Sequence, residues 1–140
     1  MLATKTITIC GKEVEMLYCA ATETGYEQLV SGTGKDINVF LPTVLERDAD
    51  GKPTKVEPPV AQTDDYLKLA LAAIIAAAAR KKQDPPVSAD EVMYDASSQE
   101  VTNMITAIIE LRTQWYIVPE AVKPETDETP KDGEVETKNA

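Results

Sequence analysis

Few residues of this chain have the type and spacing that chemistry requires. Gly32-Thr33-Gly34-Lys35 has the glycines and the lysine that end a phosphate-binding loop. A complete loop also needs glycine at position 29 and serine or threonine at position 36, where Leu29 and Asp36 stand. The sequence therefore predicts a turn that ends a helix here, and not a nucleotide site.

The clustered acidic residues are explained by their positions at the starts of helices. The chain has no histidine, which removes the commonest general base and the commonest zinc ligand. Asp64 with Asp65, and Asp90 and Glu91 with Asp95, cluster at the start of expected helices, where the helix dipole favours acidic side chains. We expect no catalytic residue, no metal and no cofactor, and hence a protein that is not an enzyme.

The two cysteines, Cys10 and Cys19, are expected to be free thiols. They fall near opposite ends of a predicted hairpin, roughly 20 Å apart, whereas a disulfide needs Cα atoms about 4.4–6.8 Å apart. Two cysteines and no recognisable signal peptide favour a reducing cytoplasm.

Charge and hydropathy exclude two classes of partner. Fourteen basic and twenty-four acidic residues give a formal charge of -10, which argues against nucleic-acid binding. The basic cluster 80–82 is better explained as a helix end. The longest apolar run, 69–79, is too short for a bilayer, which needs about 20 residues, so we expect no membrane span.

The first element is a predicted β-hairpin over residues 4–18. Apolar and polar residues alternate in both halves, with Gly11-Lys12 between them as a two-residue turn. This turn pairs Ile9 with Val14 and Ile7 with Met16, which makes one side of the ribbon apolar.

Helices dominate the rest. A short helix is predicted over 20–31, a third strand over 36–41, and either a second hairpin or a disordered connection over 42–62. The apolar run forms a helix that must be covered on most sides, by its own chain or by another. Serine–glutamate capping boxes at 88–91 and 97–100 begin a short helix and a last helix, which Pro119 stops near Tyr116. The fold class is α+β: a small N-terminal sheet packed with about four helices in one domain, 1–119, followed by a disordered acidic tail, 120–140.

Seven apolar residues are the candidate partner-binding set. In the last helix Met104, Ile108, Leu111 and Trp115 follow the spacing of a helix seam. Two strongly apolar helices are more than a chain of this size buries comfortably. The set lines either the core or a groove for another protein: Tyr66, Leu69, Ile74, Met104, Ile108, Leu111 and Trp115.

The order of these elements resembles that of phage tail assembly chaperones, most of all those of Bacteroidetes prophages. The resemblance covers residues 4–120 and rests on the ribbon Ile7-Thr8-Ile9-Cys10-Gly11-Lys12-Glu13-Val14-Glu15-Met16, on Thr22-Glu23-Thr24-Gly25-Tyr26-Glu27, on Asp64-Asp65-Tyr66, on Ser88-Ala89-Asp90-Glu91 and on Arg112-Thr113-Gln114-Trp115-Tyr116. The polar segment 46–62 departs from the simplest members of that family.

The resemblance implies a protein of the bacterial host cytoplasm that binds the aggregation-prone tape-measure protein while the tail tube assembles around it. A longer, frameshifted product of the same gene, which recruits tail tube subunits, is also implied. Two alternatives stay open: a structural tail or connector component that assembles by itself, and an acidic inhibitor module. Self-association, the client segment and the role of the middle region also stay open.

Overall fold

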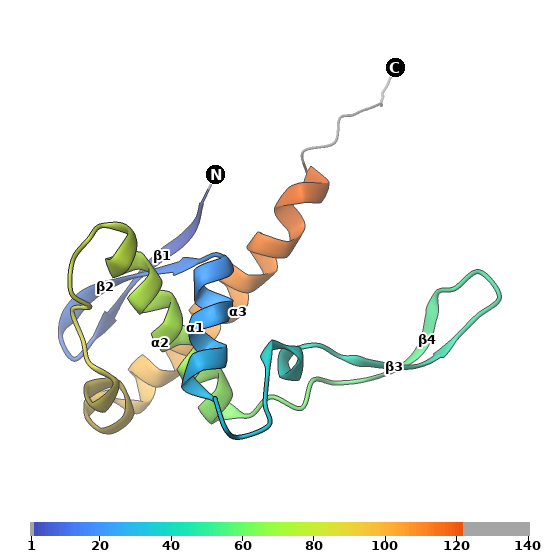
Figure 1. Cartoon of the computed structure of the whole chain (residues 1–140), viewed down its shortest axis with the longest axis horizontal. Coiled ribbons are helices and arrows are strands. Elements are labelled where there is room, and N and C mark those ends of the chain that lie inside the picture. The colour runs from blue at the N-terminus through green and yellow to red at the C-terminus, as the bar shows by residue number, and fades with distance from the viewer. Residues whose placement is uncertain (1, 122–140) are drawn as a thin grey trace, which may run out of the picture.

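The helix over the apolar run is the centre of the molecule. The computed structural model describes residues 2–121, and of residues 117–121 only the backbone. Helix α2 (Thr63–Arg80) is contacted by α1 (Ala20–Leu29), by strand β2 (Lys12–Tyr18) and by α3 (Ser98–Ala121) (Figure 1). The all-round apolar character of α2 is thus explained by its own chain, which covers it on three sides.

The predicted N-terminal ribbon is present, but its turn lies one residue earlier than expected. Strand β1 (Ala3–Ile9) pairs antiparallel with β2, with Ile7 opposite Val14 and Ile9 opposite Lys12. The turn is Cys10-Gly11, and both residues have positive φ, 52° and 77°, as a type I′ turn requires. The predicted pairing of Ile9 with Val14 was therefore wrong.

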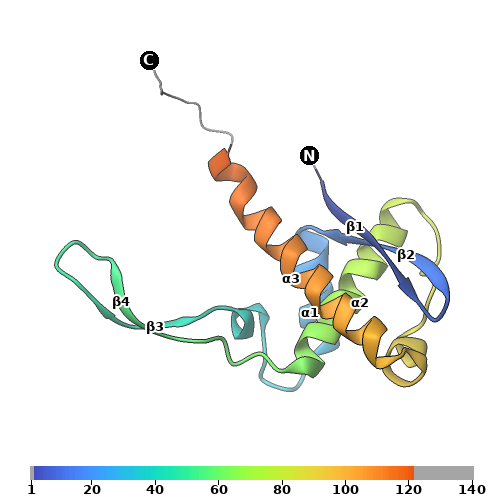
Figure 2. The same ribbon diagram turned by 180° about the vertical axis from the view of Figure 1, so that it is seen from behind.

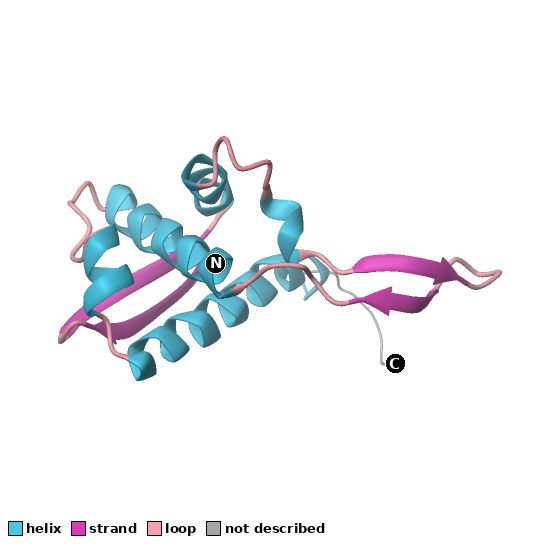
Figure 3. Cartoon of the chain, turned by 90° about the horizontal axis from the view of Figure 1, so that it is seen from below, coloured by secondary structure: helices cyan, strands magenta, loops and turns pink. Residues whose placement is uncertain are grey.

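The apolar face of the ribbon was nevertheless predicted correctly. Moving a two-residue turn by one position shifts the pairing by two residues, so each side chain keeps its face. Ile9, Val14, Met16 and Tyr18 are buried. The ribbon packs against both α2 and α3, as Figure 3 shows from below.

Residues 36–41 do not form the predicted strand. They contain the short 3₁₀ helix η1 (Ile37–Phe40), which begins where the Asp36 carboxylate accepts the Asn38 N–H at 2.9 Å. An aspartate that caps a turn competes with extended pairing, and the alternating pattern did not reveal it. The helical turn brings Phe40 into the core.

Segment 42–62 contains the second hairpin and is not a structureless connection. Strands β3 (Thr43–Arg47) and β4 (Pro53–Glu57) form a separate two-stranded sheet that projects away from the helices (Figure 2). Its end loop is organised by the Asp48 carboxylate, which accepts the N–H groups of Asp50 and Lys52. At its base, the Ala61 N–H donates to the Val39 carbonyl at 3.0 Å.

Both capping boxes are confirmed. The N–H of Glu91 donates to Ser88 Oγ at 3.1 Å, and the N–H of Ser88 donates to Glu91 Oε1 at 2.9 Å. Ser97 and Glu100 make the same reciprocal pair at the start of α3. A short π-helix, η2 (Glu91–Asp95), follows the first box.

The end of α3 was predicted too early. The helix continues through Pro119 to Ala121. A proline near a helix end removes a single backbone hydrogen bond and need not stop the last turn. The expected tail of residues 120–140 falls, from 122 on, outside the described residues.

Helices α1 and α2 approach closely at Gly25. A Cβ atom on Gly25 would lie 3.3 Å from the Cβ of Ala72. Gly25→Leu is therefore expected to lower the free energy of unfolding by about 1–3 kcal/mol, because the helices must separate. Urea denaturation measures this, and a second change, Ala72→Gly, should recover part of the loss; an unchanged midpoint for Gly25→Leu would contradict the close approach.

Candidate protein-binding site

Five of the seven candidate residues form the core of the free chain. Leu69, Ile74, Met104, Ile108 and Leu111 have no exposed surface. Tyr66 and Trp115 are half-buried and pack against that core. The five buried side chains therefore cannot contact a partner without a rearrangement, and the binding role of the set stays a prediction.

Three of the seven residues meet at a small hollow beside α3. Tyr66, Leu69 and Ile108 line a space of about 200 Å³, which we call the α3 hollow. Its remaining lining residues are Phe40, Pro59, Ile109, Arg112 and Thr113. Sequence reasoning had grouped the apolar members but had not singled out Arg112.

Trp115 lies in a separate aromatic cluster. Its ring centroid is 5.4 Å from that of Tyr18 and 5.0 Å from that of Tyr116. Both tyrosine hydroxyls donate to Oε2 of Glu23 at 2.7 Å. Burial and the bonded Glu23 carboxylate raise the pKa of Tyr18, so its hydroxyl stays protonated and the cluster joins α1, β2 and α3.

A second and larger apolar opening is a groove between α1 and α2. It has a volume of about 560 Å³. We call it the α1–α2 groove; its lining residues are Ala21, Thr24, Gly25, Gln28, Leu29, Ala72, Ile75, Ala76 and Ala79. Leu29 and Ile75 are 40% and 41% exposed, and none of the lining residues is charged.

The sequence could not have identified this groove. Every residue of the run 69–79 is apolar, so the pattern contains no polar face to show which side points outward. The groove becomes visible only when α1 is placed on α2. The one available sign was the small size of Gly25 and of the alanines in α2, which allow close approach.

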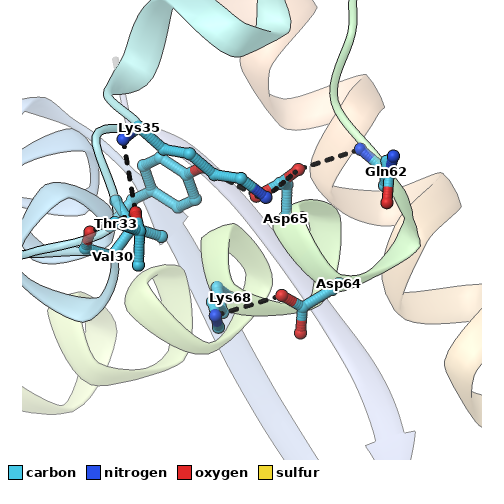
Figure 4. A network of polar contacts seen from close by, with 8 residues as sticks. Val30, Thr33, Lys35, Gln62, Asp64, Asp65 and Lys68 are labelled. Atoms are coloured by element: carbon cyan, nitrogen blue, oxygen red, sulfur yellow. Dashed lines mark hydrogen bonds and ion pairs between the residues drawn. The ribbon is translucent and has the colours of Figure 1, made fainter.

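A buried carboxylate fixes the loop after α1 onto the start of α2. Asp65 accepts hydrogen bonds from the Tyr26 hydroxyl at 3.0 Å, from Lys35 Nζ at 3.1 Å and from the Gln62 N–H at 2.9 Å. Figure 4 shows Lys35 and Gln62 on either side of Asp65, with the more exposed ion pair Asp64–Lys68 on the neighbouring part of the same helix. Burial acts to raise the pKa of Asp65, but these donors outweigh it and hold the pKa below its ordinary value.

This network also explains the glycine–lysine segment. Gly32 and Gly34 have positive φ, as residues of a turn after α1, and the Lys35 ammonium group is paired with Asp65. The prediction of a helix-ending turn is thus confirmed.

Acid is expected to destabilise the protein. The pKa values of Asp65, Glu91 and Glu100 are lowered from ordinary values of 3.8, 4.5 and 4.5; for Glu91 and Glu100 the first cause is a backbone hydrogen bond, from Ser88 and from Ser97. A carboxylate with a depressed folded-state pKa contributes stability above its unfolded pKa and loses it as pH falls through the folded value. The urea midpoint should therefore be nearly constant from about pH 7 to 5 and fall below about pH 4. An equal midpoint at pH 7 and pH 3 would contradict this.

The side chains of residues 2–116 form no metal cluster. No three His, Cys, Asp or Glu side chains among them come together as a metal site would require. Cys10 and Cys19 are free and half-buried, as predicted. No helix among these residues has the length and apolar character needed to cross a membrane.

Comparison with known proteins adds no relative. No protein-family model matches the chain. No curated protein matches it, and no solved structure does.

Proposed function

We propose that this chain is a non-enzymatic tail assembly chaperone of a phage or prophage, which binds the tape-measure protein during assembly of the tail tube. The observation that carries the proposal is the α1–α2 groove. A chain of charge -10 with 27% charged residues has here an apolar groove without a single charged lining residue. The resemblance in element order supplies the identity of the client.

The groove suits an amphipathic helix of the client. Small residues along α1 and α2 let a third helix approach closely, and the half-exposed Leu29 and Ile75 can pack between its apolar side chains. Burying one such large side chain contributes about 1.5–3 kcal/mol. A groove of this kind binds by shape and apolar contact, so it accepts many segments of a long, repetitive client.

The charge of the chain complements this role. Ten net negative charges repel other copies of the complex and oppose aggregation of the client. We place the protein in the bacterial host cytoplasm, with the tail tube protein as a second partner and no nucleic acid, membrane, metal or cofactor.

Co-expression with the tape-measure protein tests the proposal. The expected result is a client that becomes soluble and co-elutes with several copies of this chain, as measured by affinity purification and light scattering. Precipitation of the client while this chain forms a regular assembly of its own would replace the proposal with a structural tail component.

A further inference from the structure

Among residues 2–116, whose side chains the structure describes, Arg112 has no anionic partner at the α3 hollow. Its guanidinium lies 5.8 Å from the Phe40 ring centroid and 4.7 Å from that of Tyr116. Its Nε and Nη2 atoms are buried, and neither donates a hydrogen bond to any described residue. A buried donor left without an acceptor costs about 1–3 kcal/mol, so a ligand whose oxygen atoms reach these nitrogens, once the side chains that cover them move aside, recovers that energy.

The neighbouring carboxylate does not fill this role. Glu23 already accepts hydrogen bonds from the hydroxyls of Tyr18 and Tyr116. No ion pair joins Arg112 to any acidic residue within 2–116, where side chains are described. Arginine binds carboxylates through two parallel N–H bonds, and the aromatic rings beside Arg112 hold its plane.

The size and lining of the hollow define the rest of the ligand. A cavity of about 150 Å³ with an apolar lining holds a benzene molecule, so the 200 Å³ of the α3 hollow accommodate one large side chain. Small-molecule sites are larger, about 300–1,000 Å³. Phe40, Tyr66 and Ile109 supply the apolar contacts, and Arg112 adds the polar one.

We infer that the α3 hollow binds a segment of a partner protein that presents one large apolar side chain beside a carboxylate. The apolar side chain enters the hollow, and the carboxylate accepts the N–H groups of Arg112 after the side chains that cover these buried nitrogens move aside. The overall charge of -10 repels acidic partners at long range, so selection depends on this local contact. The site is distinct from the α1–α2 groove and does not depend on the proposed function.

Three designed peptides test the inference with the full chain. All are alanine-based helices with one phenylalanine, and four residues later they carry glutamate, glutamine or lysine. The glutamate peptide is expected to shift the NMR signals of Ile109 and of the Arg112 Nε–H, and to bind at least about tenfold tighter than the lysine peptide, a difference of about 1.4 kcal/mol.

One variant removes the charged contact and a second, outside the hollow, is its control. Arg112→Gln should bind all three peptides about equally, whereas Ile75→Glu, in the α1–α2 groove, should bind them as the parent does. Equal affinity of the parent for the three peptides, or no binding, would overturn the inference. Contacts from the Arg112 side chain to residues beyond 121, or a dimer that Arg112→Gln dissociates, would assign the hollow to the chain's own tail or to a second copy and would also overturn it.

Discussion

Asp65→Ala is expected to lower the free energy of unfolding by about 3 kcal/mol, because three hydrogen-bond donors lose their common acceptor. The donors left behind are the Tyr26 hydroxyl, the Lys35 ammonium group and the Gln62 N–H. Tyr26 is fully buried, so water cannot replace Asp65 there. Urea or thermal denaturation at pH 7 measures the loss.

The adjacent residue provides the control. Asp64 is also acidic and in the same helical turn, but its side chain is 48% exposed and pairs with Lys68. Exposed ion pairs of this spacing contribute about 0.3–0.5 kcal/mol, so Asp64→Ala should lower the free energy of unfolding only slightly. Similar losses of unfolding free energy for the two variants would show that the negative charge at the helix start, and not the buried network, stabilises the fold.

Under the proposed function, Ile75→Glu is expected to weaken binding of the tape-measure protein about 10- to 100-fold without unfolding the chain. Ile75 is 41% exposed in the α1–α2 groove, so a glutamate side chain can reach water in the free protein. In the complex it would place a charge against an apolar helix and forfeit about 1.5–3 kcal/mol of burial. Titration of the purified protein into a fragment of the tape-measure protein measures the change.

Two isoleucines separate binding from stability. Ile74 precedes Ile75 in the same helix but is fully buried, so Ile74→Ala should cost about 2–5 kcal/mol of stability. Its folded fraction should still bind the client normally. Met93→Glu, at 45% exposure in η2 and outside both the α1–α2 groove and the α3 hollow, matches Ile75→Glu in exposure and in the charge introduced. If Met93→Glu weakens client binding as much as Ile75→Glu does, the groove is not the client site.

The sequence was most informative where signals were local. The two serine–glutamate boxes placed the starts of η2 and α3, because each needs only residues three apart. Alternation identified the buried face of the β1–β2 ribbon. It could not locate the turn, since Gly11 suits both a type II′ turn in the first position and a type I′ turn in the second.

The proposed binding surfaces could not be predicted from the sequence, because they depend on how the helices pack against one another. In α2 two neighbouring isoleucines differ in burial, although their sequence surroundings are alike: Ile74 is in the core and Ile75 is in the groove. In α3 the apolar seam was recognised, yet its residues fill the core. The surroundings of Arg112, the residue after Leu111, could not be predicted, because its neighbour Phe40 lies 72 positions earlier in the chain.

The projecting β3–β4 ribbon is a place where the chain tolerates insertions and deletions. All the residues of both strands except Val44 are exposed, and the chain re-enters the body through the Ala61–Val39 hydrogen bond. Lengthening, shortening or exchanging residues 43–57, which leaves the buried Phe40 in place, does not alter the packing of α1, α2 and α3. A fluorescent reporter inserted at Gly51, in the exposed end loop of this ribbon, would therefore mark the protein while leaving the α1–α2 groove and the α3 hollow open.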